Sequence, residues 1–353
     1  MIDIFKAAIQ QGASDLHVKA GDYLRARIRG ELMPMTKQKM AAEQTRQLAQ
    51  QLLPEWERAN IDKIRDYDCS WGAPGVGRFR VNIFRQRGTL GIILRVIPID
   101  IPTLDDLGLP PILADLSLRN RGMILVTGIT GSGKSTTLAS MLHHINQHKK
   151  DHILTLEDPI EFLHKDNLSS ITQREVGTDT ESFSKGLRAA LREDPDTILV
   201  GEMRDAETID IALKAAETGH LLFSTLHTQN AVKTINRVIS GFPLDEQEMV
   251  RVRLSESLVA VVSQRLIPRK NGTGRVAACE IMIGTSTIRD LILDAERTDE
   301  IADLIAEGRE QYRSQTFDQH LMDLVHQDVV EFEVAKAAAN NPSDFELKMR
   351  TLA

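Results

Sequence analysis

The sequence predicts an α/β protein in which a domain built on a parallel sheet follows a smaller mixed domain. Three observations support this: a glycine-rich pattern over residues 128–135, four short apolar runs separated by helix-period segments, and a proline-rich stretch after residue 97. The chain has 353 residues, 42% hydrophobic and 26% charged, as two globular domains would have. We therefore predict an N-terminal domain over residues 1–100, a linker over 101–112 and a second domain over 113–353.

The first domain is predicted to contain a helix at its start, a strand over residues 23–28 and a helix over 43–53. Two strands complete it, over residues 78–83 and 91–97. The first of these alternates polar and apolar residues, which places Arg78 and Arg80 on one face and Phe79 and Val81 on the other.

Four prolines at positions 98, 102, 110 and 111 follow these strands. Proline fits neither a helix interior nor a central strand. We therefore interpret this stretch as the interdomain linker and as a candidate hinge.

The second domain contains apolar runs at residues 123–126, 153–156, 197–200 and 221–226. Continuous apolarity over so few residues is typical of parallel strands that are buried on both faces. Leu138, Met141, Leu142 and Ile145 form one stripe of a helix between the first two runs. From about Thr285 the pattern favours helices.

Residues 128–135 match G-x-x-x-x-G-K-[ST] between a predicted strand and a predicted helix, the context that a phosphate-binding loop requires. In such a loop backbone N–H groups and the helix N-terminus bind phosphates, the lysine reaches the terminal phosphates and the hydroxyl binds Mg²⁺. The predicted ATP-binding residues are Gly128, Thr130, Gly131, Ser132, Gly133, Lys134, Ser135 and Thr136.

Two acidic residues follow predicted strands, where open α/β sheets place their ligands. Glu157 follows the second run and Glu202 the third. ATP hydrolysis needs acids that hold magnesium and orient water, so both are catalytic candidates. Glu202 is favoured as the acid that activates water or belongs to the metal shell, with Glu157 as its close competitor. Glu202 with Ser135 is predicted to hold Mg²⁺, directly or through water. His220 and His227 flank the fourth run and are weaker candidates.

Charge is unevenly distributed, because residues 1–100 hold 16 Lys+Arg against 11 Asp+Glu while the whole chain has a net charge of −7. The second domain is therefore acidic and aromatic residues make up only 4% of the chain, which argues against a nucleic-acid translocase.

The start of the chain is charged and the sequence has no apolar run long enough to span a membrane, which predicts a cytoplasmic protein. Cys69 and Cys279 cannot form a zinc site alone, and buried apolar positions are expected for both.

Four segments in fixed order resemble one family, the type II/IV secretion ATPases. They are the phosphate loop, residues 153–159, residues 191–205 with Gly201-Glu202-Met203-Arg204-Asp205, and residues 218–228. Residues 13–17 and 78–97 resemble the PAS-like N-terminal domain of that family. The resemblance implies a RecA-like ATPase domain and a hexameric ring, with nucleotide bound between the two domains. It also implies that Arg80 and Arg95 contact phosphate.

Within the family, assembly and type II secretion members usually carry extra N-terminal sequence and a four-cysteine zinc insert, and this sequence shows neither. It therefore resembles the pilus retraction ATPases of the PilT type, which implies a Mg²⁺-dependent ATPase for twitching motility, attached to the inner membrane through a platform protein. One difference concerns residues 300–308, where Ala302 stands at a position that those ATPases tend to fill with arginine. An accessory or divergent paralogue, an assembly ATPase and a nucleotide-dependent switch are the alternatives.

Overall fold

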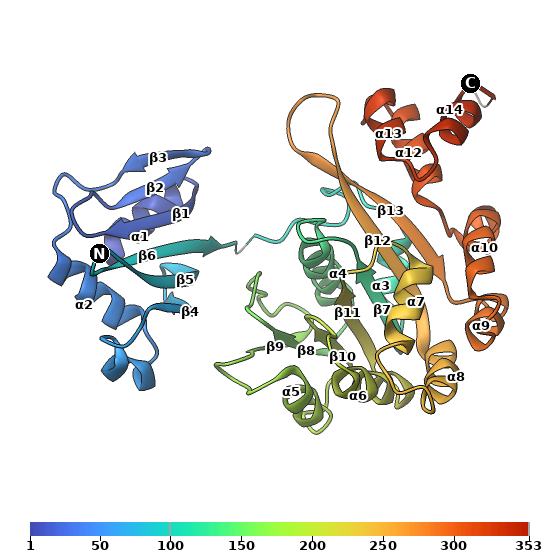
Figure 1. The fold of residues 1–353 in the computed structure, drawn as a ribbon, viewed down its shortest axis with the longest axis horizontal. Coiled ribbons are helices and arrows are strands. Elements are labelled where there is room, and N and C mark those ends of the chain that lie inside the picture. Colours follow the sequence, from blue (N-terminus) through green and yellow to red (C-terminus); the bar gives the residue numbers. More distant parts are fainter. Residues whose placement is uncertain (99, 352–353) are drawn as a thin grey trace. The chain divides into compact units, whose positions relative to one another are not determined.

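The computed structural model describes residues 1–98 and 100–351. Their contacts divide the chain into two compact units (Figure 1). Unit 1 comprises Met1–Asp100 and Glu161–Leu163, and unit 2 comprises Ile101–Ile160 and His164–Ala353.

Unit 1 is a six-stranded sheet in the order β3-β2-β1-β6-β5-β4, in which neighbouring strands run antiparallel. Its elements are α1 (Ile2–Gln10), β1 (Ala13–Lys19), β2 (Arg25–Ile28), β3 (Glu31–Pro34), α2 (Ala42–Leu52), the 3-10 turn η1 (Glu55–Asn60), β4 (Asp66–Ala73), β5 (Gly77–Gln86) and β6 (Thr89–Ile97).

Strand β5 shows why this sheet has one apolar face. Phe79, Val81 and Ile83 are fully buried, while Arg80 between them is exposed, as the alternation predicts. The buried residues pack with Leu48 of α2 into one core. The opposite face of β5 and β6 carries Arg80 and Arg95, which are exposed and paired across the two strands.

Unit 2 is a seven-stranded sheet in the order β13-β12-β7-β11-β10-β8-β9 (Figure 1). Its sheet region comprises α3 (Ile112–Ser117), β7 (Gly122–Thr127), α4 (Lys134–His148), β8 (His152–Glu157), β9 (Ser170–Glu175), α5 (Phe183–Ala190), β10 (Thr197–Val200), α6 (Ala206–Glu217), β11 (Leu221–Leu226), α7 (Ala231–Ile239), α8 (Gln247–Ser257), β12 (Leu258–Pro268) and β13 (Arg275–Ile283). The four predicted strands are β7, β8, β10 and β11, and all four are present.

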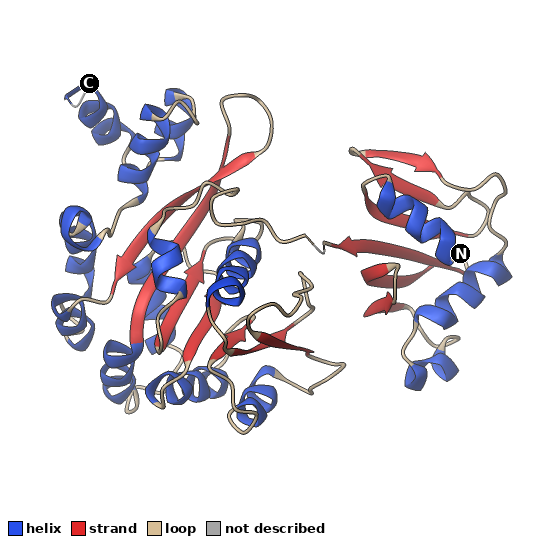
Figure 2. Ribbon diagram, turned by 180° about the vertical axis from the view of Figure 1, so that it is seen from behind, coloured by secondary structure: helices blue, strands red, loops and turns tan. Residues whose placement is uncertain are grey.

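Helices cover both faces of this sheet (Figure 2). In β7, Met123 and Leu125 belong to a core shared with α5 to α8 and with two helices after β13, whereas Ile124 and Val126 belong to a second core shared with α3 and α4. Burial on both faces explains the continuous apolar runs and confirms the predicted α/β class.

One part of the sheet differs from the expected all-parallel arrangement. Strand β12 runs parallel to β7, but β13 returns antiparallel to β12 as the edge strand. Neither strand was predicted, nor was β9 at the opposite edge. The signal for β12 lies in its β-branched and apolar start, residues 258–262, directly after a helix.

From Ser286 onward the described chain consists of helices, as expected from about Thr285. They are α9 (Ser286–Leu293), the 3-10 turn η2 (Thr298–Glu300), α10 (Ile301–Glu307), α11 (Arg309–Tyr312), α12 (Phe317–His326), α13 (Phe332–Ala338) and α14 (Pro342–Thr351). Phe317, Leu321 and Phe345 pack the last three helices, α12 to α14, against Ile267 of β12 and Val276 of β13.

The residues of the predicted linker are packed and partly buried. Leu104 and Leu109 are buried in the core of α3 and α4, and Ser140 of α4 donates a hydrogen bond to the Pro102 carbonyl at 2.7 Å. The prolines stop regular structure, but the leucines between them bury apolar surface, so residues 101–112 are packed on unit 2. Whether a hinge lies here stays a prediction.

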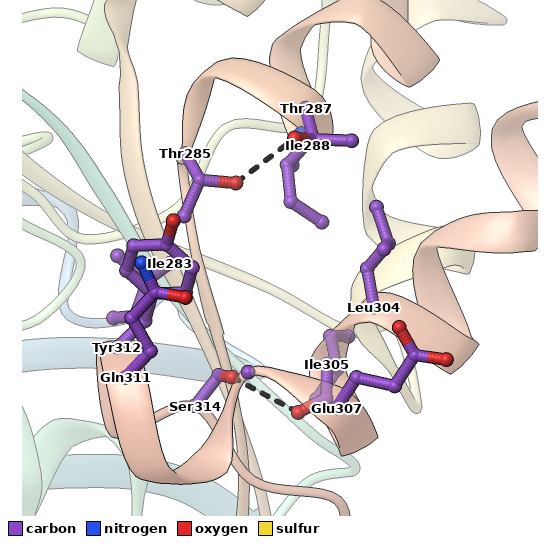
Figure 3. A pocket seen from close by; sticks show the side chains of 11 residues that line it. Ile283, Thr285, Thr287, Ile288, Leu304, Ile305, Glu307, Gln311, Tyr312 and Ser314 are labelled. Carbon is purple, nitrogen blue, oxygen red and sulfur yellow. Dashed lines mark hydrogen bonds between the residues drawn. The ribbon is translucent and has the colours of Figure 1, made fainter.

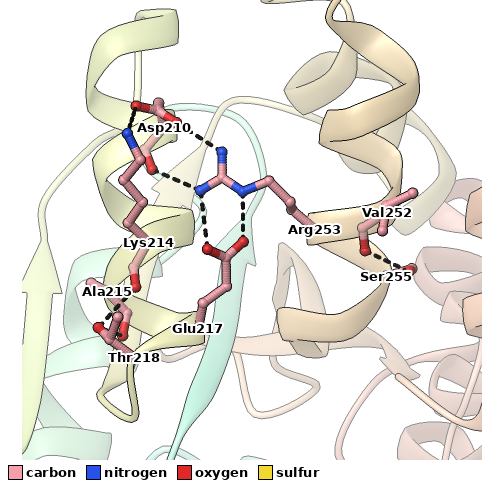
Figure 4. Close-up of polar contacts among 8 residues, drawn as sticks. All are labelled: Asp210, Lys214, Ala215, Glu217, Thr218, Val252, Arg253 and Ser255. Atoms are coloured by element: carbon pink, nitrogen blue, oxygen red, sulfur yellow. Dashed lines mark hydrogen bonds and ion pairs between the residues drawn. The ribbon is translucent and has the colours of Figure 1, made fainter.

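A network of ion pairs joins helix α8 to helix α6 (Figure 4). Arg253 of α8 contacts Asp210 at 2.8 Å and Glu217 at 2.6 Å, and Lys214 also contacts Asp210. Both carboxylates come from α6, one beyond the other along the helix, so the guanidinium bridges two turns.

The two cysteines differ in burial. Cys279 of β13 is fully buried, which raises the pKa of its thiol to about 12, whereas Cys69 of β4 is only half-buried. The expectation of a buried apolar position therefore holds for Cys279 alone.

None of the helices in residues 1–98 and 100–351 has the length and apolar content that a bilayer-crossing segment needs.

Candidate active site

The loop between β7 and α4 has the backbone of a phosphate-binding loop. Gly128, Gly131 and Gly133 adopt φ of 144°, 78° and 93°, which L side chains rarely adopt. A Cβ on Gly128 would also lie 2.5 Å from both the Gln264 carbonyl oxygen and Ser132 Oγ. Glycine is therefore required at position 128 by space as well as by conformation.

Lys134 begins the 15-residue helix α4 and is 8% exposed. Its ammonium donates hydrogen bonds to the carbonyls of Gly128 at 2.9 Å and Ile129 at 3.1 Å, so the lysine folds over the loop. The buried Ser132 hydroxyl makes no hydrogen bond to any described residue. A helix N-terminus, a lysine and a buried free hydroxyl around one glycine turn fit the phosphates of a nucleotide.

Strand β12 supports this loop from the side. Thr127 Oγ1 donates to Ser263 Oγ at 2.9 Å, at the start of the loop. Gln264 Nε2 donates to Thr137 Oγ1 at 2.8 Å, in the first turn of α4. Two successive residues of β12 thus hold both ends of the phosphate loop, a role that sequence reasoning missed.

The catalytic candidates meet at one edge of the sheet because β7, β11, β10 and β8 run parallel in this order. The phosphate loop follows β7, His227 follows β11, and Glu202 follows β10. Glu157 ends β8, and the Gly201 amide donates to the Leu156 carbonyl at 2.8 Å, so the two acidic strand ends lie side by side. This is the carboxyl edge at which open α/β sheets bind ligands.

Glu202 contacts two basic side chains. Its carboxylate lies 2.7 Å from Arg204 and 3.3 Å from His227 Nε2. Burial alone would raise the pKa of Glu202, but Arg204 and His227 outweigh it and lower that pKa below its usual value. Glu202 is therefore held as a carboxylate beside an exposed guanidinium.

Two neutral side chains donate hydrogen bonds to Glu157. Thr155 Oγ1 donates to Glu157 Oε1 at 2.7 Å, and Gln173 Nε2 donates to the same oxygen at 3.1 Å. Thr155 is fully buried in β8 and Gln173 belongs to β9. The alternation of side chains along β8 could have indicated that Thr155 lies on the same face as Glu157. No local pattern indicated that Gln173 contacts Glu157.

His220 does not join this group. It precedes β11, at the amino end of the strand, where Nδ1 lies 2.9 Å from the Ala215 carbonyl oxygen and 3.2 Å from Thr218 Oγ1. A strand of six residues separates the two ends by roughly 20 Å. The predicted catalytic role of His220 does not fit this position, because only the carboxyl end of the strand faces the site.

Arg80 and Arg95 lie in unit 1, where β5 and β6 pair them directly across the sheet. Arg95 Nε donates to Asp15 Oδ1 at 2.9 Å, and Arg27 lies 4.0 Å from the same carboxylate. Burial would raise the pKa of Asp15, yet the Arg95 contact lowers it overall. The prediction that Arg80 and Arg95 contact phosphate stays a prediction.

No group of three or more His, Cys, Asp or Glu side chains suited to a metal ion occurs in the described part of the chain. A phosphate loop holds Mg²⁺ through one hydroxyl together with the phosphates and water, so it needs no such group. Ser135 stands in the first turn of α4, directly after Lys134.

The fold and the loop define a RecA-like P-loop ATPase. A family model described as "Type II/IV secretion system protein" matches residues 1–344, and the chain belongs to this family.

Relatives match the chain over both units. The "Type IV pilus retractation ATPase PilT" of Pseudomonas aeruginosa is 46% identical over 345 residues, 97% of this chain and 99% of that protein. The "Type IV pilus ATPase PilU" of the same organism is 40% identical over 98% of this chain and 90% of its own length. A crystal structure of the pilus retraction motor PilT with bound ADP has a TM-score of 0.88 at 45% identity and covers 98% of each chain.

A pocket of about 320 Å³ lies beside the segment whose sequence differs from the retraction ATPases (Figure 3). Leu304, Ile305 and Glu307 of α10 line one side, and Tyr312 and Ser314 line another. The Ser314 hydroxyl donates to the Ile305 carbonyl at 2.9 Å. Ala302 itself is exposed and does not line the pocket.

Proposed function

We propose that the chain is the ATP-driven motor that retracts a type IV pilus, the activity behind twitching motility. The observation that carries this proposal is the 46% identity to a retraction ATPase over 345 residues. Similarity confined to the phosphate loop would support only nucleotide binding, whereas this match extends through unit 1 and the C-terminal helices. The working form is a hexameric ring, attached to the inner membrane from the cytoplasmic side through a platform protein.

In the mechanism that the residues support, the loop amides and Lys134 bind the phosphates of ATP, and Lys134 compensates the charge that develops on the transferred group. Ser135 and Glu202 are the residues that would hold Mg²⁺, which would neutralise phosphate charge when bound. Glu157 orients the attacking water, and Glu202 is its competitor for that role. Arg80 and Arg95 supply positive charge from unit 1.

The distribution of charge supports the proposed ring, as the family does. Residues 1–100 carry a net +5 and the remainder −12, so a basic unit 1 can dock on an acidic unit 2 of the next subunit. Light scattering at micromolar protein, low salt and saturating nucleotide should give the mass of a hexamer, which falls as salt screens the interface. A monomer under all of these conditions would contradict the ring.

The test of function is a deletion strain complemented with the wild type or Lys134→Ala. Loss of retraction leaves excess surface pili without movement, and only the wild type should reverse this. Purified Lys134→Ala should lose ATP turnover by roughly two orders of magnitude or more, because the β/γ charge is uncompensated. A strain without any pili would point instead to assembly.

One observation favours a second candidate, an accessory ATPase of the same machine. Ala302 stands where retraction ATPases tend to show arginine. An accessory ATPase would leave retraction intact in the deletion strain and weaken it only against load.

A further inference from the structure

We propose that Gln173 is a positioning residue for ATP hydrolysis, whose carboxamide fixes the Glu157 carboxylate relative to the loop that follows β8. This inference rests on the proposed participation of Glu157 in hydrolysis. It assigns a role to the edge strand β9, which carries none of the sequence motifs that define the site.

Strand register brings Gln173 to Glu157. Strand β9 pairs in parallel with β8, with Gln173 opposite Thr155 and Glu175 opposite Glu157. Side chains two residues apart in a strand share a face, so Thr155 and Glu157 lie on the same side as Gln173. Thr155 and Gln173 then reach the same oxygen, Glu157 Oε1, at 2.7 and 3.1 Å.

The orientation of the Gln173 amide is set by a second hydrogen bond. The backbone N–H of His164 donates to Gln173 Oε1 at 2.9 Å. A backbone amide can only donate, so the side-chain oxygen must face His164 and the NH₂ group must face Glu157. Gln173 therefore presents a donor to the carboxylate, which favours the ionised form that a base requires.

Strand β9 also holds the other end of the same loop. Glu175 is 3% exposed, and its Oε2 accepts a hydrogen bond from the Ile160 amide at 3.1 Å. The loop is thus bound at Ile160 and at His164, on either side of Glu161–Leu163, the three residues that cluster with unit 1. Gln173 therefore hydrogen-bonds to the Glu157 carboxylate and also to His164, the residue at which the chain re-enters unit 2.

The primary test compares Gln173→Met with Thr172→Val in purified protein. Gln173→Met keeps the side-chain length but loses both hydrogen bonds, and kcat should fall roughly tenfold, the rate equivalent of one hydrogen bond. ADP affinity should stay unchanged, because the phosphate loop is untouched. The acid limb of the kcat–pH profile should move to higher pH, because the ionised carboxylate has lost a donor.

Thr172→Val is the matched control on the same strand. Its hydroxyl contacts His152 at 3.0 Å and not Glu157, so its kcat and pH profile should match the wild type. Equal losses in both variants would mean that β9 acts only through folding and would overturn the proposal.

Two further variants separate the possible failures. Gln173→Glu is nearly isosteric and replaces the donor by a carboxylate, so it should lower kcat more than Gln173→Met and steepen the pH dependence. In a Glu157→Gln background, Gln173→Met should cost no further activity, because the group that it positions is gone. If Glu157→Gln turns over normally, the role of Glu157 is wrong; if Glu157→Gln is inactive and both Gln173 variants are normal, this inference is wrong.

Discussion

At the carboxyl end of β8, Glu157 accepts hydrogen bonds from the neutral side chains of Thr155 and Gln173, whereas at the end of β10 Glu202 contacts Arg204 and His227. The donors to Glu157 come from β-strands and fix its direction. The guanidinium beside Glu202 is 67% exposed and follows the strand, so another cation can replace it at little cost. This difference supports the proposal that Glu157 orients water and that Glu202 exchanges a basic partner for Mg²⁺.

The strongest test of this comparison replaces each glutamate by glutamine. Both changes should lower kcat by about 10²–10⁴, the range for loss of a positioned acid or base. Only Glu202→Gln should raise the Mg²⁺ concentration needed for half-maximal turnover, because that variant loses the anionic ligand. An equal shift of the Mg²⁺ requirement in both variants would remove the division of roles.

A smaller effect is expected for Arg204→Ala. Burial raises the pKa of Glu202 and Arg204 lowers it, so removing the guanidinium should raise that pKa and move the acid limb of the kcat–pH profile to higher pH. Activity should therefore be lost first at low pH and approach the wild-type value at high pH. Arg204→Lys retains the charge and should shift the limb less. An unchanged profile in Arg204→Ala would show that this contact does not control Glu202.

The smallest effect belongs to Thr155→Val, which removes one neutral donor from Glu157 without changing side-chain shape. Because Gln173 still donates to the same oxygen, kcat should fall only about three- to tenfold. The Mg²⁺ requirement should stay at the wild-type value, in contrast to Glu202→Gln. Steady-state turnover across a Mg²⁺ titration measures both quantities, and a large Mg²⁺ effect here would show that Glu157 also holds the metal.

The parts of this site that the sequence predicted are those encoded locally. The phosphate loop, its strand and its helix lie within residues 122–148, and each of the other predicted strands is a single apolar run. The positions of Glu157 and Glu202 at the carboxyl edge were predicted because position at a strand end is also a local property. His220 precedes its apolar run, so the same rule places it at the amino end of the strand, away from that edge.

The parts that escaped prediction depend on pairing between distant segments. Ser263 meets Thr127 across 136 positions and Gln264 meets Thr137 across 127, so only the register of β12 against β7 reveals them. Gln173 depends in the same way on the register of β9. The packing of residues 101–112 also escaped prediction, because prolines describe the local backbone, whereas the burial of Leu104 and Leu109 depends on α4.

The unequal burial of the two cysteines gives the chain a built-in position for a spectroscopic label. Cys279 is fully enclosed and its thiol pKa is near 12, so at neutral pH it offers almost no thiolate to a maleimide or a spin-label reagent. Cys69 in β4 is partly accessible and should react first. Mild labelling of the natural sequence would therefore place a fluorophore in unit 1, ready to report ATP-driven changes there without any engineered cysteine.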